Sequence, residues 1–248
     1  MSKDNEIVHH DHWEEVHTAR PKMRVPSLLT VSTKNLQDVL KKHIAKDMKV
    51  VEIGFAPGKQ LSYVAKKYGA NVTGLDYSQR GIDTAKELFA TIGIKADLRC
   101  EDVFNNTLPS DSYDVVYSAG VIEHFEDPTE IVWQHVRLLK KGGKAVILIP
   151  NYGGVYGRLQ RDYDPENLSI HNLRIMSKES LLALAKNMQV EKATTYATGG
   201  INPGLVSLHR KLPRIVARLI DQSLNMVGVF QPFKIESLCP LLVLEIRK

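Results

Sequence analysis

The chain has 248 residues, of which 43% are hydrophobic and 25% charged, and it contains two cysteines. This balance is typical of a globular protein, and so few cysteines exclude the disulfide framework of a small secreted domain. The sequence shows no apolar targeting segment at its start and no run of about 18 apolar residues. We therefore expect a cytoplasmic protein.

The net charge of +5 is unevenly distributed along the chain. Residues 49–150 carry a net charge of −1, whereas residues 201–248 carry +4. A basic protein can bind nucleic acid, an anionic membrane or an acidic substrate. Because the excess charge is concentrated in the last fifth of the chain, it does not favour a nucleic-acid partner and makes that last region the one to explain.

Short apolar segments alternate with helix-period segments from residue 46 onward. Apolar runs predict five strands, at 49–54, 70–76, 95–102, 113–120 and 144–150. Apolar side chains at helical spacing predict three helices, at 61–69, 78–93 and 128–141. Strands that are almost continuously apolar and separated by helices or loops indicate an α/β protein whose parallel sheet is covered on both faces.

The regular alternation ends at Pro150. Residues 151–176 are rich in turn formers and aromatic residues, which predicts a long lid loop over a substrate. Ser177 is placed to cap a helix, and further strands are expected at 192–198 and 238–248. We expect a single domain made of a helical cap, a cofactor-binding core, the lid loop and a C-terminal half: 1–45, 46–150, 151–176 and 177–248.

The first predicted strand runs into a glycine loop with the spacing Glu52-x-Gly54-x-Ala56-x-Gly58. Small residues let backbone N–H groups approach a ligand at the positive end of the helix that follows. A strand-to-helix turn also needs glycine without any ligand. The spacing is not the G-x-G-x-x-G of dinucleotide-binding proteins, which argues against a nicotinamide cofactor.

Acidic residues stand at the ends of the next two predicted strands. Asp76 can accept hydrogen bonds from both hydroxyls of a ribose, and Tyr77 beside it offers a ring to an adenine. Asp102, followed by Val103, is placed to bind the adenine amino group. Open α/β sheets bind their ligands at the carboxyl ends of the strands, so these residues together predict a nucleotide-type site.

These motifs, with Tyr113-Asp114, Val121 to His124 and the turn from Leu138 to Gly143, resemble class I S-adenosylmethionine-dependent methyltransferases. The small-molecule branch that includes the ubiquinone-biosynthesis-type enzymes is the most similar, and the resemblance covers about residues 45–150. It implies a Rossmann-like, mostly parallel sheet of seven strands with helices on both faces. The last two strands would form an antiparallel hairpin.

The resemblance also implies S-adenosylmethionine as the cofactor. Gly54 and Gly58 would flank its methionine part, with Ala56 in place of a commoner glycine. Ser118 stands where similar metal-dependent enzymes carry an acidic residue, so we expect no metal ion. The expected cofactor-binding residues are Glu52, Gly54, Ala56, Gly58, Asp76, Tyr77, Asp102, Val103 and Ser118.

Two neighbouring residues are the candidates for catalysis. Methyl transfer to a hydroxyl requires alignment of the oxygen and removal of its proton. His124 follows the fourth strand and titrates near neutral pH, so it is our first choice of base. Glu123 would orient it or contact the cofactor. A purely structural role for the pair, pinning the loop, remains open.

The expected substrate-binding residues come from two segments. Tyr152, Tyr156 and His171 belong to the lid loop, and Trp13 and His17 are helical neighbours near the start, able to close over the cofactor. The alternative to substrate binding is that the lid-loop residues are solvated and that the N-terminal segment is frayed. The histidines around Trp13 lack the spacing of a zinc site, which agrees with the expectation of no metal.

The stretch 203–227 predicts a basic amphipathic helix that Asn202 caps, Pro213 kinks and Gly228 ends. Its apolar and basic faces would be formed by Leu205, Leu208, Leu212, Ile215, Val216 and Leu219 on one side and Arg210, Lys211, Arg214 and Arg218 on the other. Such a helix packs as a lid or dimer surface, lies on an anionic membrane or binds a phosphate-bearing substrate. RNA binding is not favoured, because no aromatic residues interleave with the arginines.

The sequence therefore predicts a metal-independent methyltransferase that acts on a small-molecule or lipid-linked acceptor, most readily at oxygen, with nitrogen and carbon open. The alternatives are a nicotinamide-dependent oxidoreductase and a non-catalytic subunit with the same fold. The acceptor, the methylated atom and the oligomeric state stay open.

Overall fold

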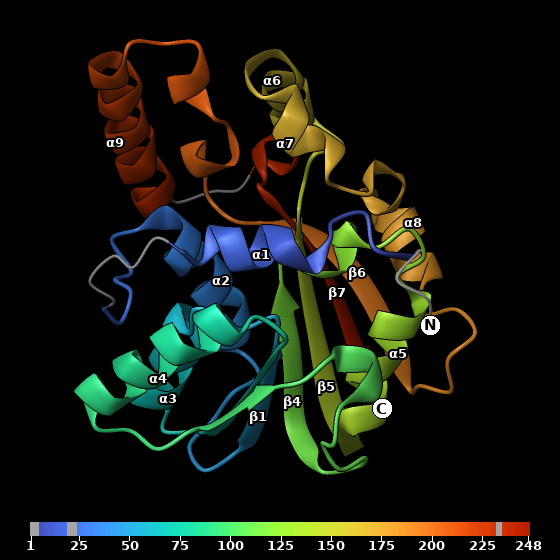
Figure 1. The fold of residues 1–248 in the computed structure, drawn as a ribbon. Coiled ribbons are helices and arrows are strands. Elements are labelled where there is room, and N and C mark those ends of the chain that lie inside the picture. Colours follow the sequence, from blue (N-terminus) through green and yellow to red (C-terminus); the bar gives the residue numbers. More distant parts are fainter. Residues whose placement is uncertain (1–4, 19–23, 232–234) are drawn as a thin grey trace.

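The computed structural model describes residues 5–18, 24–231 and 235–248, and it contains one seven-stranded sheet (Figure 1). The strand order is β3-β2-β1-β4-β5-β7-β6. Neighbouring strands from β3 to β5 are parallel, whereas β7 is antiparallel to both β5 and β6. The strands are β1 (Lys49–Ile53), β2 (Asn71–Asp76), β3 (Asp97–Cys100), β4 (Tyr113–Ala119), β5 (Leu139–Pro150), β6 (Lys192–Thr198) and β7 (Leu241–Arg247). The predicted Rossmann-like sheet with an antiparallel C-terminal hairpin is confirmed.

Helices cover both faces of the sheet because successive strand residues point to opposite sides. Val50 of β1 belongs to the hydrophobic cluster under α2 (Val31–Leu40), α3 (Lys59–Tyr68) and α4 (Gln79–Ile92). Its neighbour Val51 belongs to the cluster under α5 (Thr129–Leu138) and α8 (Lys178–Ala183). Both clusters are closed to solvent, which accounts for the apolar runs of the strands.

The first helices of the core begin and end where the sequence predicts. The Ser78 hydroxyl oxygen accepts a hydrogen bond from the Gly81 N–H at 3.1 Å and caps α4. Gly69 and Gly93 follow α3 and α4 in the left-handed conformation that ends helices.

The helix predicted at 128–141 is shorter than expected. It ends at Leu138, and β5 begins at Leu139, which pairs with Tyr113 of β4. Residues 139–141 are compatible with a helix by local propensity. Their pairing with the buried strand β4 takes precedence over that propensity.

The segment 151–176 is not a loop. It contains α6 (Val155–Tyr163), α7 (Pro165–Ser169) and a single 3₁₀ turn, η4 (Leu173–Ile175). The Asp164 carboxylate accepts a hydrogen bond from the Asn167 N–H and caps α7, whose first residue is a proline. The helices were missed because they are short and their apolar residues show no clear period. Ser177 caps α8 as predicted.

The C-terminal insert also differs from the prediction. Residues 203–227 are not one kinked helix, because Pro213 precedes a separate helix, α9 (Arg214–Phe230), which continues past Gly228. Two 3₁₀ turns come before it, η5 (Pro203–Leu205) and η6 (Leu208–Arg210), and η7 (Glu236–Leu238) precedes β7. Asn202 caps η5 by accepting from the Gly204 N–H.

The predicted apolar face of this insert is split between core and solvent. Leu205 and Leu208 pack against the core, whereas Ile215 is 76% exposed and Leu219 is 59% exposed. Helix α9 packs on α2, η5 and η6 through its opposite side. Among the described residues, no helix is long and apolar enough to span a membrane.

The N-terminal cap contains one short helix, α1 (His10–Val16), followed by α2. The part of the predicted cap at residues 1–4 and 19–23 lies outside the described residues. In Figure 1, α1 lies across the carboxyl ends of the central strands, where the sequence predicts the site.

Candidate active site

A cavity of about 510 Å³ lies at the carboxyl ends of β1, β2 and β4. The sheet order reverses between β1 and β4, and such switch points are where open α/β sheets bind ligands. A neighbouring cavity of about 390 Å³ shares Gly54, Asp76, Tyr77 and Val121 with it, so the two form one groove. We call this groove the cofactor cavity.

Asp76 is the buried carboxylate of the cofactor cavity, with 9% of its surface exposed. One oxygen accepts a hydrogen bond from the Ala56 N–H and the other from the Ser78 N–H, each at 2.9 Å. Burial raises the pKa of Asp76, and these two hydrogen bonds oppose that shift. The carboxylate therefore ties the glycine loop to the end of β2 and keeps lone pairs for a ligand.

Position 54 requires glycine because the end of β1 lies close to the residues that follow β4. It has a φ of +70°, and a Cβ at this position would lie 2.4 Å from Cγ2 of Val121. Gly58 has a different role, since a Cβ there would lie 2.8 Å from the Cβ of Ala85 on α4. Gly58 does not line the cavity; the residues of this loop that do are Gly54, Ala56, Pro57 and Lys59.

Glu52 and Ser118 are not in the lining of the cofactor cavity, contrary to the sequence expectation. The Tyr117 hydroxyl donates to Glu52 at 2.7 Å, and burial raises the pKa of Glu52 to about 8. The buried Ser118 hydroxyl forms a hydrogen bond of 2.9 Å with Nε2 of His135. Both residues therefore form hydrogen bonds within the protein behind the cavity lining.

The adenine end of the predicted site is more open. Tyr77, Asp102 and Val103 line it, as does Phe104. The Asp102 carboxylate accepts a hydrogen bond from the Phe104 N–H at 2.9 Å and caps the 3₁₀ turn η2 (Val103–Asn105). Its other oxygen accepts a hydrogen bond from the Asn105 side-chain amide at 3.2 Å, so Asp102 lies beside the cavity with both oxygens engaged.

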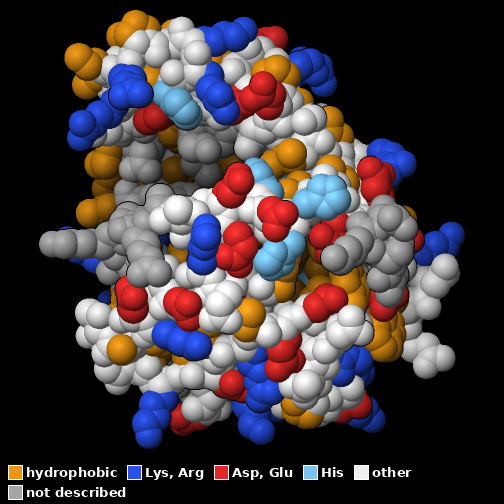
Figure 2. Space-filling view, viewed as in Figure 1, with side chains coloured by type: hydrophobic (Ala, Val, Ile, Leu, Met, Phe, Trp, Pro, Cys, Tyr) orange, Lys and Arg blue, Asp and Glu red, His pale blue; other side chains and the backbone are white. Residues whose placement is uncertain are grey.

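Helix α1 forms the outer wall of the cofactor cavity. His17 is hydrogen-bonded through Nδ1 to the Ser78 hydroxyl at 3.0 Å, and the Trp13 ring packs edge-on against His124, with centroids 4.9 Å apart. Histidines gather on this part of the surface in Figure 2. Trp13 and His17, which we expected at a substrate, lie in the lining of the cofactor cavity.

A second cavity, of about 470 Å³, lies on the other side of His124, and we call it the acceptor cavity. The two cavities share Ala119, Gly120 and His124. Its polar lining comes from five separate parts of the chain: Ser32, Gln60, Glu123, His124, Tyr152, Gln160, Asn167, His171, Asn202 and Ser207.

The structure brings Tyr152 and His171 into this lining but not Tyr156. The Tyr156 hydroxyl donates to the Leu238 carbonyl at 3.1 Å and accepts from the Asn202 N–H at 3.0 Å. Tyr156 therefore joins α6 to the C-terminal segment behind the cavity. Its aromatic character alone could not distinguish this role from substrate contact.

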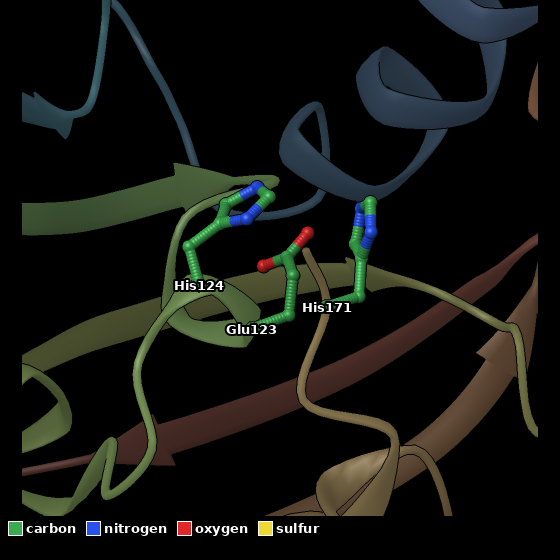
Figure 3. Close-up of side chains that lie close together, drawn as sticks. All are labelled: Glu123, His124 and His171. Atoms are coloured by element: carbon green, nitrogen blue, oxygen red, sulfur yellow. The ribbon is translucent and has the colours of Figure 1, made fainter. Parts of the chain in front are cut away.

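Glu123, His124 and His171 face one another in the acceptor cavity (Figure 3). Glu123 and His124 belong to a 3₁₀ turn, η3 (Ile122–His124), after β4. Burial raises the pKa of Glu123 to about 8 and lowers the pKa of His124 to about 4, the latter helped by His171. Burial also lowers the pKa of His171, so both imidazoles are neutral at pH 7.

Sequence reasoning missed the amides of the acceptor cavity. Gln160 donates to the side chain of Asn167 at 3.0 Å and accepts from the Ser207 N–H at 3.0 Å. Gln60 and Asn202 complete the set. Amides are common on protein surfaces, and these four lie on separate segments, so no local pattern singles them out.

The fold and the groove across its strand ends define a Rossmann-like protein with a nucleotide-type site. Residues 51–147 match the family model of a methyltransferase domain. This part of the chain is therefore similar to a methyltransferase domain, in agreement with the resemblance that the sequence motifs indicated.

Similar proteins act on different acceptors. Phosphoethanolamine N-methyltransferase 1 of Zea mays is 34% identical over 111 residues, which are 44% of this chain and 22% of that protein. A ubiquinone biosynthesis O-methyltransferase of Coxiella burnetii is 31% identical over 99 residues, 40% of this chain and 42% of that protein. The match thus spans less than half of either relative's length.

A solved structure shares the fold beyond the matched segment. It is phosphoethanolamine N-methyltransferase 2 of Haemonchus contortus in complex with phosphomonomethylethanolamine and S-adenosylhomocysteine. The TM-score is 0.62 at 18% identity, covering 87% of this chain and 52% of that one. At this identity the likeness establishes the fold alone.

Proposed function

We propose that this protein transfers a methyl group from S-adenosylmethionine to an oxygen of a small-molecule or lipid-linked acceptor. The observation that carries the proposal is the meeting of two cavities at Gly120 and His124, one at the strand ends and one behind them. A cofactor in one cavity and an acceptor in the other would meet at these residues. Methyl transfer requires the acceptor atom to lie in line with the bond between the methyl group and sulfur. The methyltransferase domain match favours this function over the nicotinamide alternative.

The cofactor cavity fits S-adenosylmethionine in size and chemistry. Its volume is within the range of small-molecule sites, and the Gly54 backbone passes where a side chain would clash. Asp76 would accept from the ribose hydroxyls, Tyr77 and Val103 would contact the adenine, and Asp102 would accept from its amino group. The cofactor supplies an activated methyl group, and the protein supplies alignment.

The acceptor cavity favours an acceptor without negative charge. Among the residues that the structure describes, none of those lining this cavity is Lys or Arg. Its polar groups are amides, hydroxyls, neutral imidazoles and the carboxyl group of Glu123, and together they match hydroxyl and carbonyl groups. A phosphate would lose water there without gaining a Lys or Arg partner. We therefore propose a neutral acceptor, unlike the phosphorylated molecule in the similar solved structure.

His124 and Glu123 are the proposed catalytic pair at the reacting oxygen. His124 lines both cavities, and Glu123 lines the acceptor cavity. The pKa values reverse the roles expected from sequence, since Glu123, with a pKa of about 8, holds a proton more firmly than His124, with a pKa of about 4. Ionised Glu123 is thus the stronger base, and neutral His124 positions the hydroxyl.

Calorimetry with the full chain tests the cofactor assignment. We expect stoichiometric binding of S-adenosylhomocysteine and none of NAD. Binding of NAD alone would favour an oxidoreductase, and binding of neither would favour a non-catalytic subunit. Screening neutral hydroxyl compounds and lipid extracts with labelled S-adenosylmethionine then identifies the acceptor class, and methylation confined to phosphorylated compounds would contradict the neutral-acceptor proposal.

We further propose that α9 contacts an anionic membrane and thereby brings lipid-linked acceptors to the cavity. Its outer side carries an apolar stripe of exposed side chains: Ile215, Val216, Leu219, Met226, Val227 and Phe230. The exposed Arg214 and Arg218 flank the stripe, and the helix's acidic residue, Asp221, is turned inward. Figure 2 shows hydrophobic and basic side chains together at the upper left, where Figure 1 draws α9.

This arrangement suits the bilayer interface, where an apolar stripe enters the acyl region and arginines meet headgroups. Helix α9 also packs on η5, whose Leu205 lines the acceptor cavity. Flotation with phosphatidylcholine vesicles, with and without phosphatidylglycerol, should show binding to the anionic vesicles that L219S weakens. L182S, at an exposed leucine of α8, is the matched control. A dimer by light scattering that L219S dissociates, without vesicle binding, would contradict the proposal.

A further inference from the structure

The three facing side chains of the acceptor cavity form a compact set of metal-ligand types. One nitrogen each of His124 and His171 and one carboxylate oxygen of Glu123 lie within 4.8 Å of one another. Figure 3 shows the carboxylate between the two imidazoles, one beside it on η3 and the other on the segment after α7. Two segments 47 residues apart thus supply the set.

Both imidazoles are held in the way that metal-binding histidines usually are. The Nδ1–H of His124 donates to the Ile170 carbonyl at 2.8 Å, and that of His171 donates to the Asn167 carbonyl at 2.7 Å. A backbone acceptor on one ring nitrogen fixes the tautomer and leaves Nε2 unprotonated, with a lone pair to offer. Neutral imidazole is the form that binds a metal.

The two segments are also tied to each other. The Asn172 N–H donates to the Glu123 carbonyl at 2.6 Å, and the Asn172 side-chain amide donates to the Phe125 and Glu126 carbonyls, each at 2.9 Å. These bonds hold the loop of Glu123 against the loop of His171. The set therefore exists before any ligand binds, which reduces the cost of ordering it.

The carboxyl group of Glu123 gives a second, independent reason to expect a ligand between these three side chains. It is 1% exposed, and its Oε2 has no hydrogen-bond partner among the described residues. A buried carboxyl oxygen without a partner is costly, and its neighbours in the set are two neutral rings. A cation between the three side chains would compensate that oxygen and use the lone pair of each imidazole.

We propose that Glu123, His124 and His171 bind a divalent first-row transition cation such as Zn²⁺. Two nitrogens and one oxygen suit such an ion better than Mg²⁺ or Ca²⁺, which take oxygen ligands. Three protein ligands leave coordination positions open toward the acceptor cavity. This departs from the sequence expectation of a metal-free enzyme, because that expectation considered only Ser118 and the spacing of the N-terminal histidines.

The role of the ion rests on the proposed function. An acceptor hydroxyl that coordinates the ion in an open position becomes more acidic, so its proton leaves more readily and the oxygen attacks the methyl group as an alkoxide or phenolate. The released proton would go to solvent, and the new O–CH₃ bond would form as the C–S bond of the sulfonium breaks, which releases S-adenosylhomocysteine. In this state Glu123 and His124 hold the ion and do not themselves take the proton.

Metal binding is measured on the full chain without any acceptor. The chelator-stripped protein is titrated with Zn²⁺ by calorimetry and with Co²⁺ by visible absorption, which reports nitrogen and oxygen ligands. We expect one tight site per chain. E123Q and H171A should each weaken it by more than about 100-fold, since loss even of outer-shell groups costs 10–100-fold. H209A, at an exposed histidine of η6, is the matched control and should bind as the wild type.

Binding of S-adenosylhomocysteine by each variant shows that it is folded. The proposal is overturned if the stripped wild type binds no ion tightly, or if E123Q and H171A bind it as tightly as H209A, which would place the ion on the N-terminal histidines instead. Failure of the proposed function is a separate result, because a protein that binds Zn²⁺ but not S-adenosylhomocysteine keeps the metal site and loses the methyltransferase assignment.

Discussion

The cofactor cavity and the acceptor cavity are built from the chain in different ways. The first is lined chiefly by the residues that directly follow β1, β2, β3 and β4, with α1 laid over them. The second takes its polar groups from α3, η3, α6, α7 and the turns before α9. The residues of a site at strand ends recur after each strand, so a sequence pattern can locate them. The residues of a site built from short helices recur at no regular spacing, so no sequence pattern locates them.

His124 belongs to both cavities, so its replacement gives the largest expected effect. We expect H124A to lower kcat about 100-fold, the usual scale for a group at the reacting proton, while the dissociation constant of S-adenosylhomocysteine changes little. Turnover is measured with the acceptor that the wild type methylates, and H209A is the control. A normal kcat would remove His124 from the catalytic machinery and separate the two cavities functionally.

Asp76 belongs to the cofactor cavity alone. We expect D76A to weaken binding of S-adenosylhomocysteine by about 1–3 kcal/mol, because two ribose hydroxyls and two backbone N–H groups lose their acceptor. Calorimetry gives the dissociation constant, and D83A, at the half-buried Asp83 of α4, controls for the charge change. An unchanged dissociation constant would show that the ribose lies elsewhere.

Gln160 belongs to the acceptor cavity alone. We expect Q160A to raise the KM for the acceptor about 10-fold through loss of one buried hydrogen-bonding group, with cofactor binding unaltered. Steady-state kinetics under saturating S-adenosylmethionine measure the change. A matched shift in cofactor affinity would contradict the separation of the two cavities.

The buried Glu52, in the sheet behind both cavities, makes the stability of the fold depend on pH. Its folded-state pKa of about 8 lies above the unfolded value, so the unfolded state releases a proton as pH rises past about 4.5 and the folded state does not. Its contribution to stability is therefore full at low pH and is lost as pH rises toward 8. We expect E52Q to flatten this decline and to be more stable at pH 8 by roughly 1 kcal/mol in urea unfolding. An unchanged pH dependence would show that Glu52 is ionised in the folded protein.

Local patterns predicted the sheet well because they record burial. Alternating residues of β1 face the two clusters, and Ser78 and Gly93 bound α4 as their chemistry dictates. The same reasoning left open whether the apolar face of residues 203–227 packs on protein or meets a membrane, and in the structure Ile215 and Leu219 of α9 are exposed. An amphipathic period shows that one side of a helix is apolar, but it does not say which surface that side meets.

Residue type and spacing determined the Rossmann-like core, the glycine loop and the acidic residue at each strand end, because these depend on contacts within a few residues of a strand. Only the tertiary structure decided that Ser118 and Tyr156 lie behind the cavities and that Glu123, His124 and His171 face one another. These outcomes depend on segments far apart in the chain. They also depend on burial, which is the largest cause of the opposite shifts in the pKa values of Glu123 and His124.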